Sequence, residues 1–427
     1  MKIISSTRDA PWQSLEAQDG DGVPDLSHGP VVTPNFKGFG ICFNELGWNA
    51  LSLLNSADRD HVLNLLFNRQ TGCGFSYNRV PIGASDFSTG WYSHNEAAGD
   101  FEMANFSVAR DEVALIPYLC SAQTILGDRM ILFASPWCPP TWMKTPPVYN
   151  FGGLTWEPKY RKAYADYLVC FVNAYEALGI RVDAIHVQNE PDSNQKFPSC
   201  LWTGAKLRDF IRDDLGPAFR SASLDTQIWL GTIERGSFND WVAPTLYDPV
   251  ARGFLSGIGF QWAGKNGIQR AHQAAPELPL IQTENECGDG SNTWDYTHYV
   301  FDLIQHYVSN GVEAYVYWNA VLEHGGVSTW GWRQNSLFCV DPETRVAVAN
   351  PEFHLMRHLS GFVRPGAAVL ESRGLLRANG ICFRNADGAH VSVLQNPSDA
   401  ALPCNLALGD ETVRVELPPR SFTTFAE

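Results

Sequence analysis

Two glutamates stand at matching positions in two segments that resemble β-strands. Glu190 lies three residues after Val187, the last aliphatic residue of its segment. Glu284 lies three residues after Ile281, the last aliphatic residue of the other. In one parallel barrel both carboxyl groups emerge at the same height, and strand alternation places each on the face of its even-numbered neighbours. Two facing carboxyl groups about 5–5.5 Å apart are what retaining glycoside hydrolysis requires, so the spacing indicates that chemistry.

Each glutamate has an alternative interpretation. Glu190 stands in the short motif Asn-Glu-Pro and could instead be an ion-paired residue at the rim of the fold. Glu286 has the same parity as Glu284 and lies one step higher, nearer the loop Cys-Gly-Asp-Gly, which makes it the rival nucleophile. Whichever carboxyl is the acid must stay protonated, and a neighbouring carboxylate with partial desolvation would raise its pKa.

Strand-like and helix-like runs alternate along most of the chain. The strand-like runs span 38–46, 75–83, 129–137, 182–190, 227–235, 257–264, 279–286 and 314–322. Helical periodicity is clearest over 50–67, 158–179 and 294–311, and the last two runs end on Gly. Eight strand–helix pairs predict an α/β fold of the (β/α)8 TIM-barrel type, with the chemistry at the carboxyl ends of the strands. A doubly wound open sheet is the alternative.

The chain changes character near residue 364. Residues 364–427 alternate apolar and polar side chains between turn residues, and residues 1–35 are rich in Pro, Gly and Asp. We therefore expect a catalytic barrel over 36–363 and a small C-terminal β-sandwich over 364–427. The segment 1–35 is expected to add a strand to that sandwich.

The composition of the 427-residue chain limits its partners. A formal net charge of -15 argues against nucleic acid or an anionic membrane surface, which are bound by clusters of Lys and Arg. No apolar run has the length of a membrane span, so we expect no membrane insertion. The N-terminal residues show no signal-peptide pattern, which predicts a cytoplasmic enzyme, or a secreted one if a leader was removed. The eleven histidines lack HExxH and HxH spacing, and we expect no metal and no cofactor. The sequence makes no prediction of oligomeric state.

Five longer motifs carry a resemblance to a known family. They are RVPIGASDFS (79–88), FASPWCPPTWMKT (133–145), QNEP (188–191), QTENECG (282–288) and YWNAVLEHGG (317–326). In this order they make the chain resemble glycoside hydrolase family 30, the group of glucosylceramidases and β-1,6-glucanases, over nearly its whole length. The resemblance implies a TIM barrel, a β-sandwich formed from both chain ends, and cleavage of a β-linked glycoside with retention.

The resemblance also implies roles for individual residues. Glu190 takes the place of the family's acid/base, and Glu284 takes the place of its nucleophile. Asn189 matches the residue that holds the 2-hydroxyl of the sugar, a hydrogen bond that can strengthen in the transition state.

Three further residues match the lining of the family's sugar pocket. Asp86 matches a carboxylate that binds distal hydroxyls of the sugar, and the alternative for it is a helix-capping role. Trp137 and Trp318 match aromatic residues of the same pocket, and the alternative for both is core packing.

The sequence departs from glucosylceramidase at several positions. Gln261, Trp262 and Ala263 replace a His-Trp-Tyr run near the nucleophile, so the first two are expected to contact a substrate in a changed subsite. Glu45 could contact substrate or form a buried ion pair. His186 could donate a hydrogen bond beneath the site or be a core histidine.

The expected substrates are β-linked glucosides or oligo- and polysaccharides, with β-1,6-glucan among the candidates. The same mechanism on a β-xyloside, β-fucoside or β-galactan is the first alternative, since one hydroxyl or methylene separates those sugars. The second alternative is a carbohydrate-binding barrel without catalysis, which the presence of both carboxyl groups disfavours.

Overall fold

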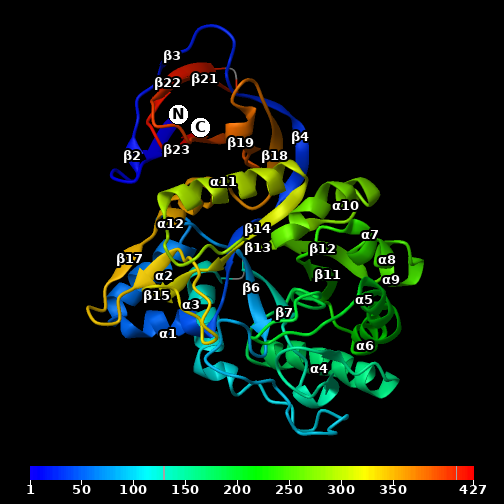
Figure 1. Cartoon of the computed structure of the whole chain (residues 1–427). Coiled ribbons are helices and arrows are strands. Elements are labelled where there is room, and N and C mark those ends of the chain that lie inside the picture. The colour runs from blue at the N-terminus through cyan, green and yellow to red at the C-terminus, as the bar shows by residue number, and fades with distance from the viewer. Residues whose placement is uncertain (128–129, 410) are drawn as a thin grey trace.

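The computed structural model describes residues 1–127, 130–409 and 411–427, and its centre is a closed barrel of eight parallel strands (Figure 1). Around the barrel the strands follow the order β10, β11, β12, β13, β14, β5, β6, β7. They are β5 (Gly38–Cys42), β6 (Tyr77–Ile82), β7 (Ile131–Pro136), β10 (Ala184–His186), β11 (Gln227–Ile233), β12 (Leu255–Gln261), β13 (Leu280–Glu284) and β14 (Val312–Asn319). Each overlaps one predicted strand-like run, although residue 129 of the third run lies outside the described residues. The TIM-barrel prediction is confirmed, and the open-sheet alternative is wrong.

Helices connect the strands and cover the barrel. They are α1 (Glu45–Leu53), α2 (Ser56–Phe67), α3 (Leu115–Leu126), α4 (Pro158–Ala177), α5 (Gly204–Phe210), α6 (Gly216–Ser221), α7 (Phe238–Trp241), α8 (Ala243–Leu246), α9 (Pro249–Arg252), α10 (Ile268–Ala274), α11 (Trp294–Ser309) and α12 (Pro351–Ser360). The predicted helices at 158–179 and 294–311 are confirmed as α4 and α11. The run 50–67 is divided into two helices, because Leu54 is extended and Asn55 begins α2 by accepting the N–H of Asp58.

Both ends of the chain meet in a second, antiparallel layer. Its strands are β1 (Lys2–Ser6), β2 (Gln13–Ser14), β3 (Gln18–Asp19), β4 (Ser27–Phe36), β18 (Ala367–Arg373), β19 (Gly380–Arg384), β20 (His390–Asn396), β21 (Leu402–Leu408), β22 (Glu411–Leu417) and β23 (Ser421–Ala426). A seven-stranded sheet contains β1 beside β23, and a three-stranded sheet contains β21, β22 and β3. Apolar side chains such as Leu394 and Leu406 pack between the two sheets. The predicted sandwich with an N-terminal strand is confirmed, whereas its limits at residues 35 and 364 stay predictions.

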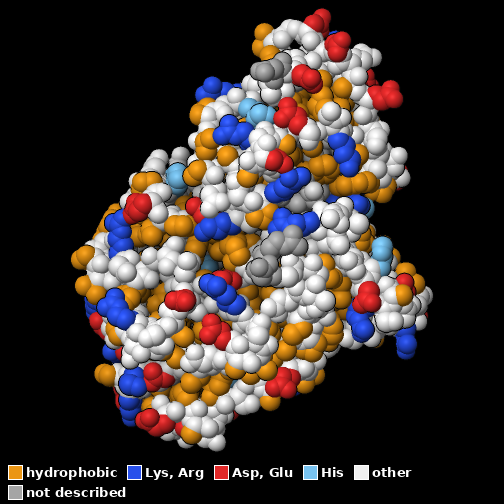
Figure 2. Space-filling model, turned by 180° about the vertical axis from the view of Figure 1, so that it is seen from behind, with side chains coloured by type: hydrophobic (Ala, Val, Ile, Leu, Met, Phe, Trp, Pro, Cys, Tyr) orange, Lys and Arg blue, Asp and Glu red, His pale blue; other side chains and the backbone are white. Residues whose placement is uncertain are grey.

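Helix α11 joins the sandwich to the barrel. Figure 1 shows this helix between the two layers, and Trp294 at its start donates to the carbonyl of Arg420 over 2.7 Å. His298, one turn later, shares a 2.9 Å hydrogen bond with Gln395 of β20. Seen from behind, the sandwich forms a narrower lobe on the wider barrel, and acidic and basic side chains lie on both lobes (Figure 2).

Five short strands belong to the loops outside the barrel. They are β8 (Lys144–Thr145), β9 (Gly153–Leu154), β15 (Val321–Glu323), β16 (Phe338–Val340) and β17 (Ala347–Ala349). The chain between β15 and β16 carries side chains of the site described below.

The lower half of the barrel interior is an apolar layer. It consists of Tyr77, Phe133, Ala184, Trp229, Ile281, Ala314 and Val316. His186 lies on this layer, with its ring 4.5 Å from that of Phe133 and 5.3 Å from that of Trp229. These contacts favour the alternative of a core histidine over a hydrogen bond beneath the site, although neither ring nitrogen of His186 has a hydrogen-bond partner among the residues that the structure describes.

Candidate active site

A pocket of about 410 Å³ opens at the carboxyl ends of the barrel strands. Most of the predicted site residues line it, namely Asp86, Trp137, Asn189, Glu190, Trp262 and Glu284. They come from β6, β7, β10, β12 and β13 or from the loops that follow these strands. The pocket thus lies where a TIM barrel carries its ligand-binding groups.

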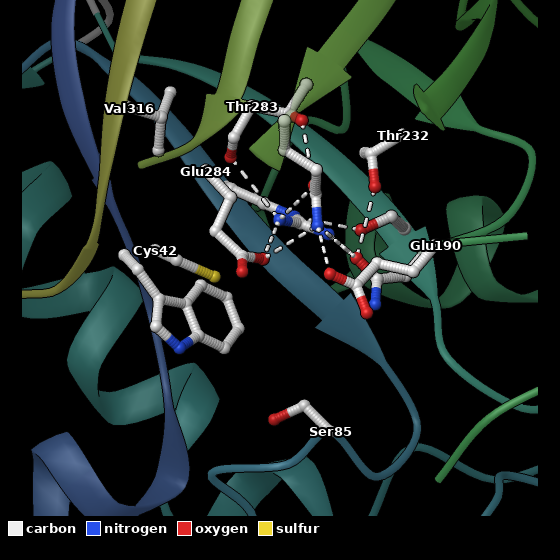
Figure 3. A network of polar contacts seen from close by, with 12 residues as sticks. Cys42, Ser85, Glu190, Thr232, Thr283, Glu284 and Val316 are labelled. Atoms are coloured by element: carbon white, nitrogen blue, oxygen red, sulfur yellow. Dashed lines mark hydrogen bonds and ion pairs between the residues drawn. The ribbon is translucent and has the colours of Figure 1, made fainter. Parts of the chain in front are cut away.

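The carboxyl groups of Glu190 and Glu284 share one hydrogen-bond donor. The side-chain NH2 of Gln261 lies 3.2 Å from Glu190 Oε1 and 3.3 Å from Glu284 Oε2, so these oxygens are at most about 6.5 Å apart. Figure 3 shows the two glutamates on either side of this polar network. A separation this short fits direct attack on a sugar by one carboxylate while the other protonates the leaving oxygen.

The backbone around Glu190 is fixed by the two neighbouring strands. Beyond the end of β10, the N–H of Asn189 donates to Pro136 of β7 over 2.8 Å. The N–H of Glu190 donates to Thr232 of β11 over 3.2 Å. Glu190 itself has a φ of 45°, an uncommon left-handed conformation that such tethering sustains at functional sites.

The side chain of Glu284 points into the pocket, although strict alternation along β13 would point it outward. Ile281 belongs to the apolar layer inside the barrel, so strict alternation would turn Glu284 away from the interior. Phe260 of β12 pairs with Gln282, but the next residue, Gln261, pairs with Glu284. This irregularity inserts one extra residue in β13 and turns the glutamate inward. The parity argument is therefore wrong for β13, although the predicted height and location are correct.

Arg79, which the sequence analysis did not assign to the site, holds the network together. Its fully buried guanidinium donates to Glu284 Oε2 over 2.8 Å, and it donates to Asn189 Oδ1 over 2.6 Å. Its Nε donates to Ser135 over 2.9 Å. The available signal was position: Arg79 stands two residues after Tyr77 on β6, so it shares the interior face of the barrel.

Two tryptophans pack on this arginine. The guanidinium carbon of Arg79 lies 4.5 Å from the ring centroid of Trp137 and 5.4 Å from that of Trp318. The two indole rings stack 5.5 Å apart, and each side chain is buried. Trp137 lines the pocket, whereas Trp318 lies behind it and packs on Phe87 and Arg79. The structure thus supports a pocket position for Trp137 and the core-packing alternative for Trp318.

Burial and mutual repulsion disfavour ionisation of the carboxyl groups in the pocket. Burial, against the opposing effect of Arg79 and with a contribution from the neighbouring Glu190, raises the pKa of Glu284 to about 7. Burial also raises the pKa of Glu190. Because Arg79 donates directly to Glu284 but not to Glu190, the ionised form is best stabilised at Glu284 and the proton at Glu190. This is the distribution of charge that a nucleophile and an acid need.

Asp86 offers an unused carboxylate oxygen to the pocket. The side chain is 6 % exposed, and no described residue makes a hydrogen bond to its Oδ1. Burial raises the pKa of Asp86, and the carboxylates of Glu284 and Glu190 add to the effect. Asp86 is not the N-cap residue of any helix in the described residues, and within them no hydrogen bond joins its side chain to a helix N–H, which disfavours the helix-capping alternative. A buried oxygen that lacks a partner and faces a pocket is suited to bind ligand hydroxyls.

Asn189 and Trp262 complete the contacts at the two glutamates. The side-chain oxygen of Asn189 accepts hydrogen bonds from Arg79, Thr232 and Gln261. Its NH2 group is then free of these partners and available to a ligand. The indole N–H of Trp262 donates to Glu284 Oε1 over 3.0 Å. The structure therefore places Gln261 and Trp262 against the catalytic candidates, and their predicted contact with substrate stays a prediction.

Two predicted or rival residues lie outside the pocket lining. Glu45, at the start of α1, accepts from Thr89 over 2.7 Å and pairs with Arg110 over 3.2 Å. The ion-pair alternative thus holds for Glu45, which is not among the residues that line the pocket at the strand ends. Glu286 forms an ion pair with Lys265 and is not among the residues that line the pocket.

Comparison with known proteins identifies the fold family. Residues 36–363 match the glycosyl hydrolase family 30 TIM-barrel domain. The chain belongs to glycosyl hydrolase family 30. Family 30 enzymes retain the configuration of the anomeric carbon, and this chain is accordingly a family 30 β-glycosidase. The predicted resemblance and the predicted enzyme class are confirmed.

Relatives within family 30 include two kinds of enzyme. A protein of Caenorhabditis elegans named putative glucosylceramidase 4 is 29% identical over 401 residues, which are 87% of this chain and 76% of the relative. An endo-1,6-beta-D-glucanase of Neurospora crassa is 27% identical over 383 residues, 84% of this chain and 78% of the relative.

Solved structures share the whole architecture. SrfJ from Salmonella typhimurium has a TM-score of 0.90 at 26% identity, over 100% of this chain and 99% of that one. The endo-beta1,6-glucanase BT3312 has the same fold, with a TM-score of 0.87 at 24% identity over 100% and 98% of the two chains.

The described residues contain neither a membrane-spanning helix nor a cluster of metal-binding side chains. No helix among residues 1–127, 130–409 and 411–427 combines the length and apolarity of a membrane span. Within the same ranges no group of three or more His, Cys, Asp and Glu side chains is arranged to hold a metal ion.

Proposed function

We propose that this family 30 enzyme hydrolyses β-linked glucosides by double displacement, with Glu284 as the nucleophile and Glu190 as the acid/base. The observation that carries the proposal is the asymmetric network at the two carboxyl groups. Both accept from Gln261, but only Glu284 accepts from the buried Arg79 as well. The two groups are thus close together, and the direct hydrogen bond from Arg79 favours the ionised form at Glu284 more than at Glu190.

The first step forms a covalent glycosyl enzyme. A carboxylate oxygen of Glu284 bonds to the anomeric carbon while the bond from that carbon to the leaving oxygen breaks. The proton on Glu190 moves to the leaving oxygen, so the leaving group departs as a neutral alcohol. In the second step Glu190 takes a proton from water, the water oxygen bonds to the anomeric carbon, and Glu284 is released as carboxylate.

Other pocket residues suit a sugar with several hydroxyl groups. The NH2 of Asn189 is available to the 2-hydroxyl, and the free oxygen of Asp86 is available to hydroxyls farther from the anomeric carbon. One relative is named a glucosylceramidase and another an endo-1,6-beta-D-glucanase, and both names refer to a substrate that contains glucose. We therefore propose glucose for the sugar that becomes attached to the enzyme, and β-1,6-linked glucan among the natural substrates.

The acid/base role has a specific kinetic test. In Glu190→Ala, protonation of the leaving group is lost, so kcat/KM on an aryl β-glucoside with a poor leaving group should fall about 1,000-fold. With a good leaving group, such as dinitrophenolate, the first step needs no acid, and kcat/KM should fall less than about 10-fold. Azide, which needs no general base, should raise the turnover of the variant.

Matched substrates separate the alternatives. Equal losses on both aryl glucosides would overturn the role of Glu190. If the wild type turned over an aryl β-xyloside, β-fucoside or β-galactoside faster than the aryl β-glucoside, the assignment of glucose as the bound sugar would be wrong. Absence of turnover of every aryl β-glycoside by the wild type would overturn the catalytic proposal and favour a binding protein.

A further inference from the structure

The two catalytic candidates divide the rim of the barrel into two unequal arcs. Glu190 follows β10 and Glu284 ends β13, and the barrel order places β11 and β12 between them on one side. The other side holds β14, β5, β6 and β7, and from it come Asp86 and Trp137. Because those two residues suit the sugar that bonds to the enzyme, the leaving group must lie over the short arc of β11 and β12.

A buried carboxyl group on this short arc has one oxygen without a hydrogen-bond partner among the described residues. Glu234 directly follows β11, lines the pocket and is 4 % exposed. Its Oε1 accepts the N–H of Asp192 over 2.9 Å and lies 3.6 Å from Arg235 Nε, whereas its Oε2 has no hydrogen-bond partner in the part of the chain that the structure describes. A buried polar atom costs folding free energy unless it is hydrogen-bonded, and this one faces a cavity where a ligand could supply the bond.

An aromatic face stands in the same pocket. Trp332, from the chain between β15 and β16, lines the pocket and is 39 % exposed. Its ring lies 6.2 Å from that of Phe197, and Lys196 lies 5.0 Å from it. Phe197 and Lys196 belong to the loop after β10, so these contacts hold the indole, which comes from the chain after β14, against the loop that follows Glu190. Part of its surface stays open. Partly exposed, fixed aromatic rings suit stacking against the C–H face of a sugar.

We propose that Glu234 and Trp332 form a leaving-group subsite that binds a second sugar residue. The inference rests on the proposed function and adds the chemical class of the leaving group. A sugar presents hydroxyl groups at its edge for the free oxygen of Glu234 and an apolar face for Trp332.

The chemistry of the short arc disfavours a lipid leaving group. Glu234 and Arg235 follow β11, and Ser193 and Gln195 line the pocket from the loop after β10, whereas Trp262 and Ala263 after β12 supply its apolar part. An alkyl chain would bury those polar groups without offering them hydrogen bonds. Burial and the neighbouring Glu190 raise the pKa of Glu234 to about 8. The raised pKa favours the protonated form of this carboxyl group, which can donate to one hydroxyl while it accepts from another.

Two substrates that differ only in the leaving group test the subsite. The first is an aryl β-glucoside with a good leaving group, and the second is whichever β-linked glucose disaccharide the wild type cleaves fastest. Glu234→Leu and Trp332→Ala should each lower kcat/KM on the disaccharide about 10- to 100-fold. The losses on the aryl glucoside should be at least about 5-fold smaller than on the disaccharide, because an aryl leaving group offers no sugar hydroxyl to Glu234 and departs without protonation.

Two further variants separate binding from folding. Glu234→Gln keeps the shape of the side chain and the bond from Asp192, and it should recover most of the disaccharide activity. Trp91→Ala is the matched control for Trp332→Ala, because Trp91 is exposed to a similar degree, 43 %, but does not line the pocket. It should leave both substrates unaffected.

The two substrates distinguish a failure of the proposed subsite from a failure of the proposed function. Equal losses on both substrates in Glu234→Leu and Trp332→Ala would show a structural role and overturn the subsite. Wild-type cleavage of the aryl glucoside but of no glucose disaccharide would also overturn it, while the proposed mechanism would stand. Turnover of neither substrate by the wild type would instead overturn the proposed function.

Discussion

The barrel interior contains two layers that differ in almost every physical property. In the lower layer, side chains such as Tyr77, Trp229 and Ile281 fill the space with apolar groups and aromatic rings. In the upper layer, Arg79 and Glu284 form a buried ion pair joined to amide side chains. On β6 the distance between the layers is only two residues, from Tyr77 to Arg79.

The difference between the layers separates stability from chemistry. Apolar packing in the lower layer contributes free energy of folding in proportion to the area it buries. Buried charges cost desolvation free energy, which is offset when each has a partner, and they are retained where function needs them. We therefore expect substitutions in the upper layer to lower activity far more than stability, and those in the lower layer to do the opposite.

Glu284→Gly should give the largest effect and is the strongest test of the upper layer. Without the nucleophile, kcat should fall by about 100,000-fold or more. Azide or formate should partly restore cleavage of an activated aryl glucoside by occupying the space left. Steady-state rates with and without azide, and a thermal melt of the variant, check the expectation. A variant that kept a tenth of the wild-type rate, or lost its cooperative melt, would break the comparison.

Trp229→Ala should do the reverse from the lower layer. The indole ring is 1 % exposed and stacks on His186, so its loss leaves a cavity and should lower the free energy of unfolding by about 3–5 kcal/mol. The kcat of the folded protein should remain within about 3-fold of the wild type. Urea unfolding and kcat at low temperature measure the two quantities. A fall in the kcat of the folded protein well beyond about 3-fold would show that the two layers are coupled.

Asp86→Asn sharpens the comparison within the pocket. Replacing a carboxylate that binds sugar hydroxyls should lower kcat/KM on an aryl β-glucoside about 100-fold. The melting temperature should stay equal or rise, because the carboxylate of the free protein has no partner for Oδ1 among the described residues. Glu286→Gln, at an ion-paired glutamate outside the pocket lining, is the control and should keep both quantities close to the wild type. A clear drop in melting temperature for Asp86→Asn would indicate a structural role instead.

Arg79→Lys should give the smallest effect, a shift in the pH profile. The wild-type kcat/KM should fall as the pH drops through the raised pKa of Glu284, about 7, because the nucleophile must be ionised. Lysine cannot make all the contacts of the guanidinium, so it lowers the pKa of Glu284 less than Arg79 does. The acidic limb of the pH profile should therefore move up by about one pH unit. The pH dependence of kcat/KM measures this, and an unchanged or lowered limb would contradict the charge assignment.

Much of the fold was predictable because its signals are local. Each barrel strand overlaps a run of β-forming residues, and each catalytic candidate lies at or within two residues of the end of such a run. The single helix expected at 50–67 is two helices because Leu54 adopts an extended conformation that periodicity does not reveal.

The unpredicted parts of the site depend on contacts between distant segments. Arg79 meets Asn189 and Glu284, which lie far along the chain, so its partners cannot be inferred from β6 alone. The inward turn of Glu284 depends on a register irregularity against β12, which alternation cannot anticipate. Glu234 stands in an Ile-Glu-Arg-Gly segment typical of an exposed turn, and only the closure of the barrel buries it.

Covalent labelling of the nucleophile tests the central claim most directly. A 2-deoxy-2-fluoro-β-glucosyl fluoride should inactivate the enzyme, because the fluorine slows hydrolysis of the glycosyl enzyme more than its formation. Proteolysis and mass spectrometry of the labelled protein should then locate the sugar on the side chain of Glu284. A label on Glu286, or on any other residue, would contradict the assignment of the nucleophile.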